Sequence, residues 1–281
     1  MATDILDSNL PHAYLPDTIG AQVLALVREE SRTALVAATD SISTASIAYP
    51  RVTSDVPVTW LAEGAPFPTD GPGLDEVVVV PTKVGGMTRL SSEAFADSPN
   101  APATVSQSLA ASIARSIDKA FVTTVAAPAP QGLSTITFAA ANTVTAGVAS
   151  VNLDWVTDAA AAVELAGGAA TAVLVSPATA AYLAKLKSGS ASNETLLQAD
   201  PTTPTVRMAN GLPLVVFRDL PDGIGYVIDG SRTRLVIRDN AKVDVSTDRY
   251  FDTGHVAVRA TARVGFGLVD PRCVVKVKFS A

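Results

Sequence analysis

The clearest pattern along the chain is an apolar residue at every fourth position between residues 99 and 128. This spacing aligns apolar side chains in one stripe along an α-helix. Ser98 and the prolines that follow it favour a helix start, and Pro128 and Pro130 favour an end, so the sequence predicts one long helix here. The stripe consists of Val105, Leu109, Ile113, Ile117 and Phe121.

A strict alternation of residues near the end of the chain predicts a long strand with one buried face. One face holds His255, Ala257, Arg259, Thr261 and Arg263, and the other holds Val256, Val258, Ala260, Ala262 and Val264. A second, shorter alternation after Pro271 predicts a last strand. Its apolar positions are Val275, Val277 and Phe279, separated by Lys276 and Lys278.

Residues 47–90 carry the pattern of a long two-stranded hairpin, with a tip rich in glycine and proline from Gly64 to Gly73. Such a hairpin is marginally stable alone in water. Its apolar residues, which include Trp60, Phe67 and four consecutive valines, indicate that it rests on another surface, such as a neighbouring subunit. An ordinary sheet edge is the alternative.

Weaker patterns complete the prediction of secondary structure. Residues 1–16 predict an arm that orders on a partner, and a helix is expected from Asp17 until its pattern fades between Ser41 and Ser46. A second helix, capped by Ser150 or Asn152, should end at Gly167-Gly168. The remaining elements are a buried strand at 172–175, a helix from Ser176-Pro177 to near Gly189, and strands at 211–217, 225–229 and 235–238 that complete one mixed sheet.

Composition excludes several classes of protein. The 281 residues are 48% hydrophobic, enough for a full core, yet no stretch has the length of a membrane span, and the start lacks the order of a signal peptide. A single cysteine cannot form an internal disulfide, and two histidines make no metal cluster. A net charge of -6 without runs of lysine or arginine argues against direct binding of nucleic acid.

Catalytic motifs are missing from the sequence. Neither His12 nor His255 has a nucleophile pattern nearby, and there is no Gly-x-Ser-x-Gly elbow. Asp222-Gly-Ile-Gly-Tyr lacks the rest of a phosphate loop and predicts a tight turn. The acidic pairs at 75–76 and at 219 and 222 are expected to be solvated. The arginines at 232, 234 and 238 should face water, or else anchor carboxylates of a neighbour.

The order of these elements resembles the Hong Kong 97-type family of phage major capsid proteins. The motifs that carry the resemblance span most of residues 16–279. They are Trp60-Leu-Ala-Glu63-Gly64, Pro81-Thr-Lys83-Val84, Leu90-Ser-Ser-Glu93-Ala-Phe-Ala-Asp97-Ser98, Val173-Leu-Val-Ser-Pro177, Leu183-Ala-Lys-Leu-Lys187, Asn210-Gly211-Leu-Pro213-Leu-Val and Val264-Gly-Phe-Gly-Leu-Val-Asp-Pro271.

The resemblance implies an α+β fold with five segments. These are an N-terminal arm (1–46), an extended loop with flanking strands of a peripheral domain (47–98), a spine helix (99–128), an axial domain (129–238) and closing strands of the peripheral domain (239–281). Intersubunit contacts are expected at Trp60, Glu63, Phe67 and Arg89.

The implied function is structural and needs no enzyme activity or cofactor. The chain should form pentamers and hexamers of an icosahedral phage head around double-stranded DNA, which it encloses without reading its sequence. Partners would include portal and scaffolding proteins and a possible cement or decoration protein, with no membrane. The protein would belong to the virion and assemble in the bacterial host cytoplasm.

Two departures from the family pattern shape these expectations. Some relatives join subunits covalently through a loop lysine, an asparagine and a glutamate; here Val77–Val80 stand at the lysine position, and residues 254–262 contain neither asparagine nor glutamate. We therefore expect no such crosslink. The chain also starts at the arm, with Met1, which favours scaffolding by a separate protein. The main alternative is an encapsulin, a compartment with the same fold, and a more distant one is a soluble α+β enzyme.

Overall fold

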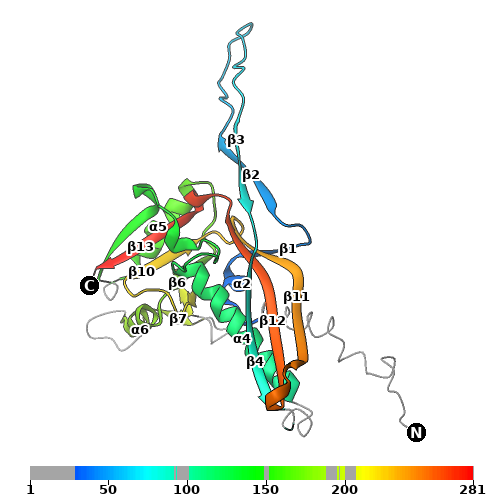
Figure 1. The fold of residues 1–281 in the computed structure, drawn as a ribbon. Helices are drawn as coiled ribbons and strands as arrows, with labels where there is room; N and C mark the ends of the chain where they lie inside the picture. Colours follow the sequence, from blue (N-terminus) through cyan, green and yellow to red (C-terminus); the bar gives the residue numbers. More distant parts are fainter. Residues whose placement is uncertain are drawn as a thin grey trace.

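Two β-sheets and a long helix form the body of the molecule, and a two-stranded hairpin projects from it (Figure 1). The structure is a computed structural model that describes residues 29–91, 93, 101–148, 152–187, 195, 197–199 and 207–280. The arm predicted for residues 1–16 and the start of the helix predicted from Asp17 lie outside this part of the chain.

The first sheet contains the long alternating strand predicted near the end of the chain. Its strand order is β1-β11-β12-β4, with β1 parallel to β11 and the other pairs antiparallel. The alternation is confirmed, because Val256, Val258 and Ala260 are buried on one face while Arg259 is exposed on the other. The bounds are β1 (Ala38–Ile42), β4 (Thr82–Ser91), β11 (Thr233–Tyr250) and β12 (His255–Leu268).

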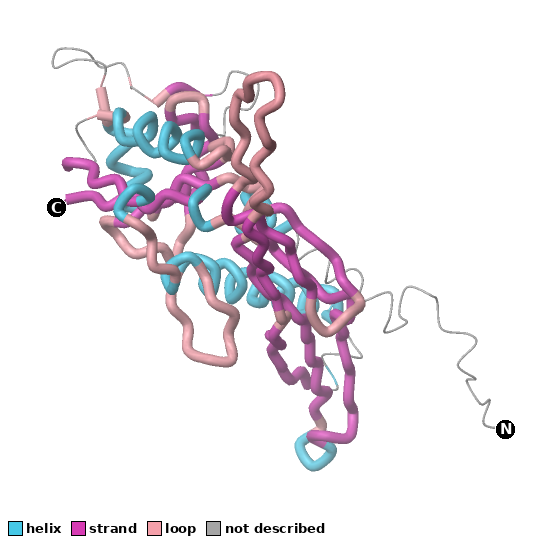
Figure 2. The backbone as a smooth tube through the Cα atoms, turned by 90° about the horizontal axis from the view of Figure 1, so that it is seen from above, coloured by secondary structure: helices cyan, strands magenta, loops and turns pink. Residues whose placement is uncertain are grey.

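The predicted long helix is α4 (Ala101–Val122), which ends before Pro128 and lies along one face of this sheet (Figure 2). Ile113, Ile117 and Phe121 of the predicted stripe are buried, while Val105 and Leu109 pack at its edge. The helix also buries Ala110 and Ala114 against a sheet face that carries Ala260 and Ala262. Because these side chains are small on both sides, helix and sheet approach closely.

The second sheet has seven strands in the order β5-β13-β10-β6-β9-β8-β7. Trp155 and Val163 of α5 (Asp154–Leu165) and Leu183 of α6 (Pro177–Lys185) pack in one core cluster on the sheet, and the end of α4 packs in another. The predicted buried strand and the helix start at Ser176-Pro177 are confirmed. The strands are β5 (Thr143–Val148), β6 (Ala172–Val175), β7 (Gln198–Ala199), β8 (Arg207–Ala209), β9 (Leu212–Val216), β10 (Ile224–Ile228) and β13 (Val274–Ser280).

Three expectations about the elements are corrected. Residues 235–238 do not complete the mixed sheet, because they belong to β11 in the four-stranded sheet, whereas β13 leaves the long strands and pairs with β10 and β5. The early helix ends with α2 (Arg32–Val36), before β1, so it does not reach Ser41. At the start of α5, Leu153 occupies the N-cap position, and no side chain caps the helix.

The predicted hairpin is confirmed as β2 (Ile47–Ser54) paired with β3 (Gly73–Val79), while its return continues past Pro81 into β4. Apolar residues of its root pack on the first sheet, where Val79 meets Ile42 and Val236. Tyr49 donates a hydrogen bond to Asp40, 2.5 Å away, and Arg234 lies over the Tyr49 ring and 3.7 Å from Asp40. Burial, together with this carboxylate, raises the pKa of Tyr49.

Arg232 is exposed, as preferred, but the position of Arg234 corrects the preference for a solvated side chain. Its side chain is only partly exposed, and its carboxylate partner belongs to the same chain. The guanidinium therefore helps to hold the hairpin root on the sheet, since it contacts Asp40 of β1 and Tyr49 of β2 together.

Two glycines of β12 provide the space in which the hairpin root lies. A Cβ at Gly265 would stand 2.8 Å from Val79 Cγ1 and 3.3 Å from Pro81 Cα, and one at Gly267 would stand 2.7 Å from Val79 Cγ2. Valine has little rotamer freedom with which to move away. The direction in which the hairpin leaves the body therefore depends on these glycines.

A carboxylate on α4 ties the start of α2 to the body. Asp118 accepts hydrogen bonds from the hydroxyls of Ser31 and Thr33 at 2.7 and 2.8 Å, and from the backbone N–H groups of Arg32 and Thr33 at 2.9 Å each. Both hydroxyl residues are buried. One side chain thus satisfies several donors that a helix start leaves open.

Gly265→Ala should lower the free energy of unfolding by about 1–3 kcal/mol, because the added methyl group overpacks the hairpin root. Urea unfolding of the unassembled subunit measures this effect. Gly71→Ala is the matched control, since a Cβ there meets nothing within 4 Å. Equal unfolding energies for the two variants would contradict the close packing described above.

Asp118→Asn should lower the free energy of unfolding by roughly 1.5–3 kcal/mol, since hydrogen bonds to a charged acceptor are lost and an amide N–H group faces other donors. Thermal and urea unfolding provide the measurement. Asp219→Asn removes an exposed carboxylate and serves as the control. If both variants unfold alike, Asp118 does not anchor α2.

Candidate assembly surfaces

The hairpin tip, residues 55–72, extends beyond the last strand pair between Ser54 and Gly73. The N–H of Ala65 donates to the carbonyl of Ala62 at 3.0 Å, and Gly64, at φ +84°, adopts the left-handed conformation that this turn needs. Trp60 is 104% exposed and Phe67 is 80% exposed. Two large aromatic side chains therefore stand in water, far from any core of their own subunit.

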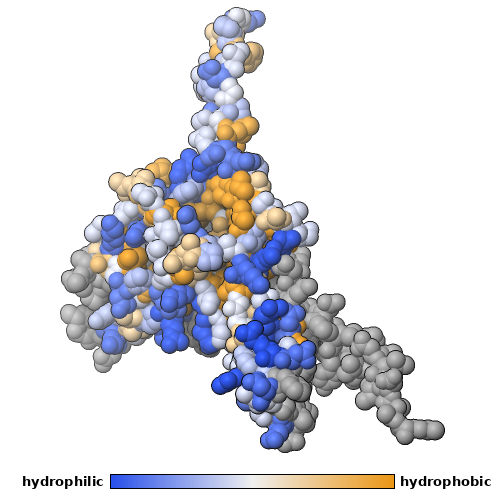
Figure 3. Space-filling view, in the orientation of Figure 1, coloured by the Kyte–Doolittle hydropathy of each residue, from blue (hydrophilic) through white to orange (hydrophobic). Residues whose placement is uncertain are grey.

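Further apolar side chains are exposed along both sides of the hairpin, and Figure 3 shows hydrophobic surface at several levels of it and around its root. Exposed apolar residues that are continuous along one element mark an interaction surface more often than scattered ones do. Besides the two aromatic residues they are Val52, Val56, Val58, Leu74, Val78 and Val80.

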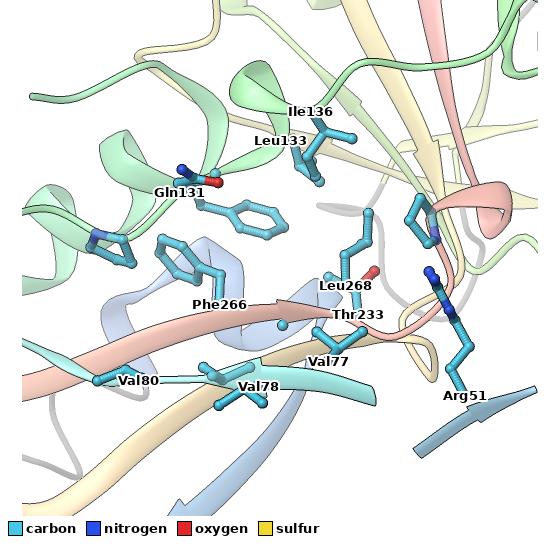
Figure 4. Close-up of a pocket in the computed structure, with 16 residues that line it drawn as sticks. Arg51, Val77, Val78, Val80, Gln131, Leu133, Ile136, Thr233, Phe266 and Leu268 are labelled. Atoms are coloured by element: carbon cyan, nitrogen blue, oxygen red, sulfur yellow. The ribbon is translucent and has the colours of Figure 1, made fainter. Parts of the chain in front are cut away.

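A mainly apolar pocket of about 420 Å³ opens at the hairpin root (Figure 4). Valines of β3 line one side, Leu133 and Ile136 line the other, and Phe266 points into it. Its polar lining residues are Arg51, Gln131 and Thr233, and within the described part of the chain Arg51 Nε and Thr233 Oγ1 have no hydrogen-bond partner. The lining contains no histidine, cysteine or carboxylate, so the pocket suits an apolar side chain better than a proton-transfer reaction.

The four residues expected to make intersubunit contacts separate into two places. Trp60, Glu63 and Phe67 all lie on the exposed hairpin tip. Arg89 lies on β4 opposite Ala257, where it is exposed at the end of the sheet far from the tip (Figure 1). One subunit therefore does not bring Arg89 together with the other three.

A further set of residues was missed by sequence reasoning. Strand pairing places Arg263 of β12 between Lys83 of β4 and Arg238 of β11. These three residues, here called the cationic row, are far apart in the sequence. The alternation around Arg263 was the only sequence signal for them, because the sequence does not show which residues of the neighbouring strands lie opposite one another.

The titratable side chains that were considered as candidates for chemistry have structural roles. Asp222 accepts a hydrogen bond from Ser176 Oγ at 2.6 Å, and Gly223, at φ +78°, confirms the predicted tight turn. His255 Nδ1 lies 2.6 Å from the carbonyl of Thr253. Burial raises the pKa of the Cys273 thiol, which disfavours the reactive thiolate.

Two buried carboxylates are also explained by local hydrogen bonds. The Arg272 side chain donates to Asp270, which lowers the pKa of that carboxyl group. Burial acts to raise the pKa of Asp229, but hydrogen bonds from Ser231 and from the N–H of Ala169 outweigh it and lower the value. Both groups are therefore ionised structural acceptors.

Among the described residues, no cluster of histidine, cysteine, aspartate and glutamate is suited to hold a metal ion. The helices in the same part of the chain are too short or too polar to cross a membrane.

Comparison with known proteins identifies the family. The model of the phage capsid family matches residues 13–279. The capsid of the empty GTA particle has a TM-score of 0.74 and 21% identity, over 95% of this chain and 100% of that chain. A chain from Mycobacterium phage Adephagia has a TM-score of 0.71 and 17% identity, over 89% and 90%. No curated protein matches the sequence.

The capsid of the native GTA particle also matches, with a TM-score of 0.71 and 21% identity over 88% of this chain and 89% of that chain. In this fold the hairpin precedes the long helix α4, and two sheets complete the body. The chain therefore has the Hong Kong 97-type fold and belongs to the phage capsid family, as a major capsid protein that forms a shell and is part of the virion.

Proposed function

We propose that the chain assembles into the pentamers and hexamers of an icosahedral phage head that encloses double-stranded DNA. The observation that carries the proposal is the projecting hairpin, whose aromatic and aliphatic side chains are exposed in the single subunit. Full burial of such a side chain contributes about 1.5–3 kcal/mol. A neighbouring copy, repeated by symmetry, provides this burial for every subunit at once.

We propose that the five segments expected from the resemblance apply to this chain, with changes to the last two. The hairpin suits the extended loop (47–98), α4 the spine helix (99–128) and the seven-stranded sheet most of the axial domain (129–238). Within the closing segment 239–281, β13 pairs into that second sheet. We propose that β13 belongs to the axial domain and that β11 and β12 belong to the peripheral domain, while segment 1–46 is the arm.

The remaining partners follow from the role as a shell. We propose that the protein assembles in the bacterial host cytoplasm with portal and scaffolding proteins, with or without a cement protein. Its net charge of -6 suits a container whose wall does not bind DNA through the release of counterions. The shell therefore encloses DNA without recognising its sequence. The role needs no enzymatic step. The family match favours this phage head over the encapsulin alternative.

We also propose that shell strength comes from noncovalent contacts. Val77–Val80 occupy β3 and its exit, where the crosslinking lysine of some relatives would fall, and β12 from His255 to Ala262 offers neither asparagine nor glutamate. Boiled in detergent, assembled shells should separate into single chains on a denaturing gel. A ladder of covalent multimers would contradict this part of the proposal.

Negative-stain imaging of the purified protein, with and without a scaffold, tests the assembly directly. Closed shells are expected, and particles from the native source should protect DNA from nuclease. Shells that enclose protein and no genome would favour the encapsulin alternative. A small oligomer at every concentration would contradict the shell and reopen the search for an enzyme.

Trp60→Ala combined with Phe67→Ala should reduce the yield of shells at least tenfold and leave the unfolding of the single subunit unchanged. The reason is that both rings are exposed in the subunit and gain burial only on a neighbour. Light scattering and imaging measure the yield. Leu165→Ala removes another exposed apolar residue, 91% exposed on α5, and is the control. Equal yields for all three proteins would exclude the tip as a contact.

A further inference from the structure

The cationic row is unusual because three like charges stand directly opposite one another in a sheet. In the strand register Lys83 pairs with Arg263, and Arg263 pairs with Arg238. Like charges in cross-strand positions destabilise a sheet. The arrangement is therefore expected to persist only where another contact compensates for the repulsion.

All three side chains of the cationic row lie on the face of the sheet opposite α4. Their neighbours along the strands, Val84, Val264 and Ile237, pack in the core beneath the helix, and side chains alternate between the faces of a strand. Lys83 is exposed, and both arginines are half-buried. On the same face the hairpin root covers Gly265, so the cationic row begins where that cover ends.

No carboxylate of the described part of the chain forms an ion pair with the cationic row. On the same face, Arg259 has its own partner in Asp244 at 2.6 Å, and nearer the hairpin Arg234 lies beside Asp40. Within the described part of the chain, these three cations thus stand together without an ion-pair partner, although the whole chain is acidic. A partner with negative charge fits this surface best.

The hairpin carries the complementary charge. Between Arg51 and Lys83 there are five acidic residues and not one lysine, arginine or histidine, which leaves 22 acidic and 21 basic residues in the rest of the chain. With Arg51 of β2 counted, the hairpin therefore carries four of the six net negative charges. Three of the acids lie on the tip itself. They are Asp55, Glu63 and Asp70, here called the tip carboxylates.

The tip of a subunit points away from the strands that carry its own cationic row. Figure 1 shows the hairpin leaving the body at one end of the first sheet, while β4 and β12 run from the root in the opposite direction. Within one subunit the tip carboxylates and the cationic row thus do not meet. Two copies can bring them together.

We propose that the hairpin tip of one copy docks across the cationic row of a neighbouring copy, with the tip carboxylates facing Lys83, Arg263 and Arg238. This inference rests on the proposed assembly into a shell and names the surface that receives the hairpin. Exposed ion pairs contribute little energy each, whereas complementary charge steers association and sets register. Trp60 and Phe67 then contribute the apolar burial, and the charges determine where the tip lies.

A charge exchange tests the contact. The row variant K83E/R238E/R263E and the tip variant D55K/E63K/D70K should each assemble at least tenfold more slowly than the parent protein, followed by light scattering. The chain that combines both sets should recover assembly, since each copy then presents two reversed and complementary surfaces. Variant R115E/R218E/K278E changes the same number of basic residues at exposed positions elsewhere and should assemble normally.

Other outcomes overturn the proposal in separable ways. If the row and tip variants both assemble at the parental rate, the tip does not dock there, although the shell itself stands. If the row variant forms normal shells that lose protected DNA, nucleic acid is the partner of the row. If the added substitutions D4K/D7K/D17K restore assembly of the row variant, the N-terminal segment is the partner of the row instead. Failure of the parent protein to assemble would contradict the proposed function itself.

A separate control tests whether the variants fold normally before they assemble. Circular dichroism and urea unfolding of the unassembled variants should match the parent protein, because the row variant replaces three like charges by three of the opposite sign. Higher salt should slow parental assembly toward the rate of the single-set variants, since a wet charge contact is screened within about 8–10 Å. A parental rate that is insensitive to salt would contradict an electrostatic register.

Discussion

The structure depends on a hairpin that cannot bury its own apolar side chains. A two-stranded hairpin is a single layer, so the side chains that project from β2, β3 and the tip have no core to pack into within the hairpin. In a single subunit Trp60 and Phe67 remain in water. The lowest free energy is therefore reached only when another surface covers them, and in the proposed assembly that surface belongs to a second copy.

Such a projection is useful only if its root is held firmly. The root is fixed by close packing of Val79 over Gly265 and Gly267, and by the contacts of Tyr49 with Asp40 and Arg234. Beneath it, the small side chains of α4 and β12 bring helix and sheet close together. The packed helix and sheet thus support the root, and the sheet face on which the root lies also carries the cationic row.

Periodicity predicted the elements whose environment is set locally. The stripe of α4 and the alternation of β12 each have one buried face, and the same residues that form the element also form its core. The tip residues Trp60 and Phe67 were accessible to sequence reasoning for a similar reason, since large apolar residues in a glycine- and proline-rich turn have little to pack against.

Features that depend on pairing between distant strands were not predictable in this way. Residues 235–238 read as a short strand of the second sheet, but the chain continues through them into β11, and their partners lie on β1 and β12. The partners of Arg234 and the neighbours of Arg263 follow from that register alone. The start of α5 is a local feature that was nevertheless predicted wrongly. Leu153 occupies the N-cap position, and the polar residue Asn152 does not supply the expected cap.

A reconstruction of the assembled particle that resolves side chains tests the account most directly. The account predicts that each hairpin tip lies on the four-stranded sheet of a neighbouring subunit, with Trp60 and Phe67 buried and acidic residues of the tip facing basic residues of that sheet. Tips that point into solvent, or that fold back on their own subunit, would contradict it.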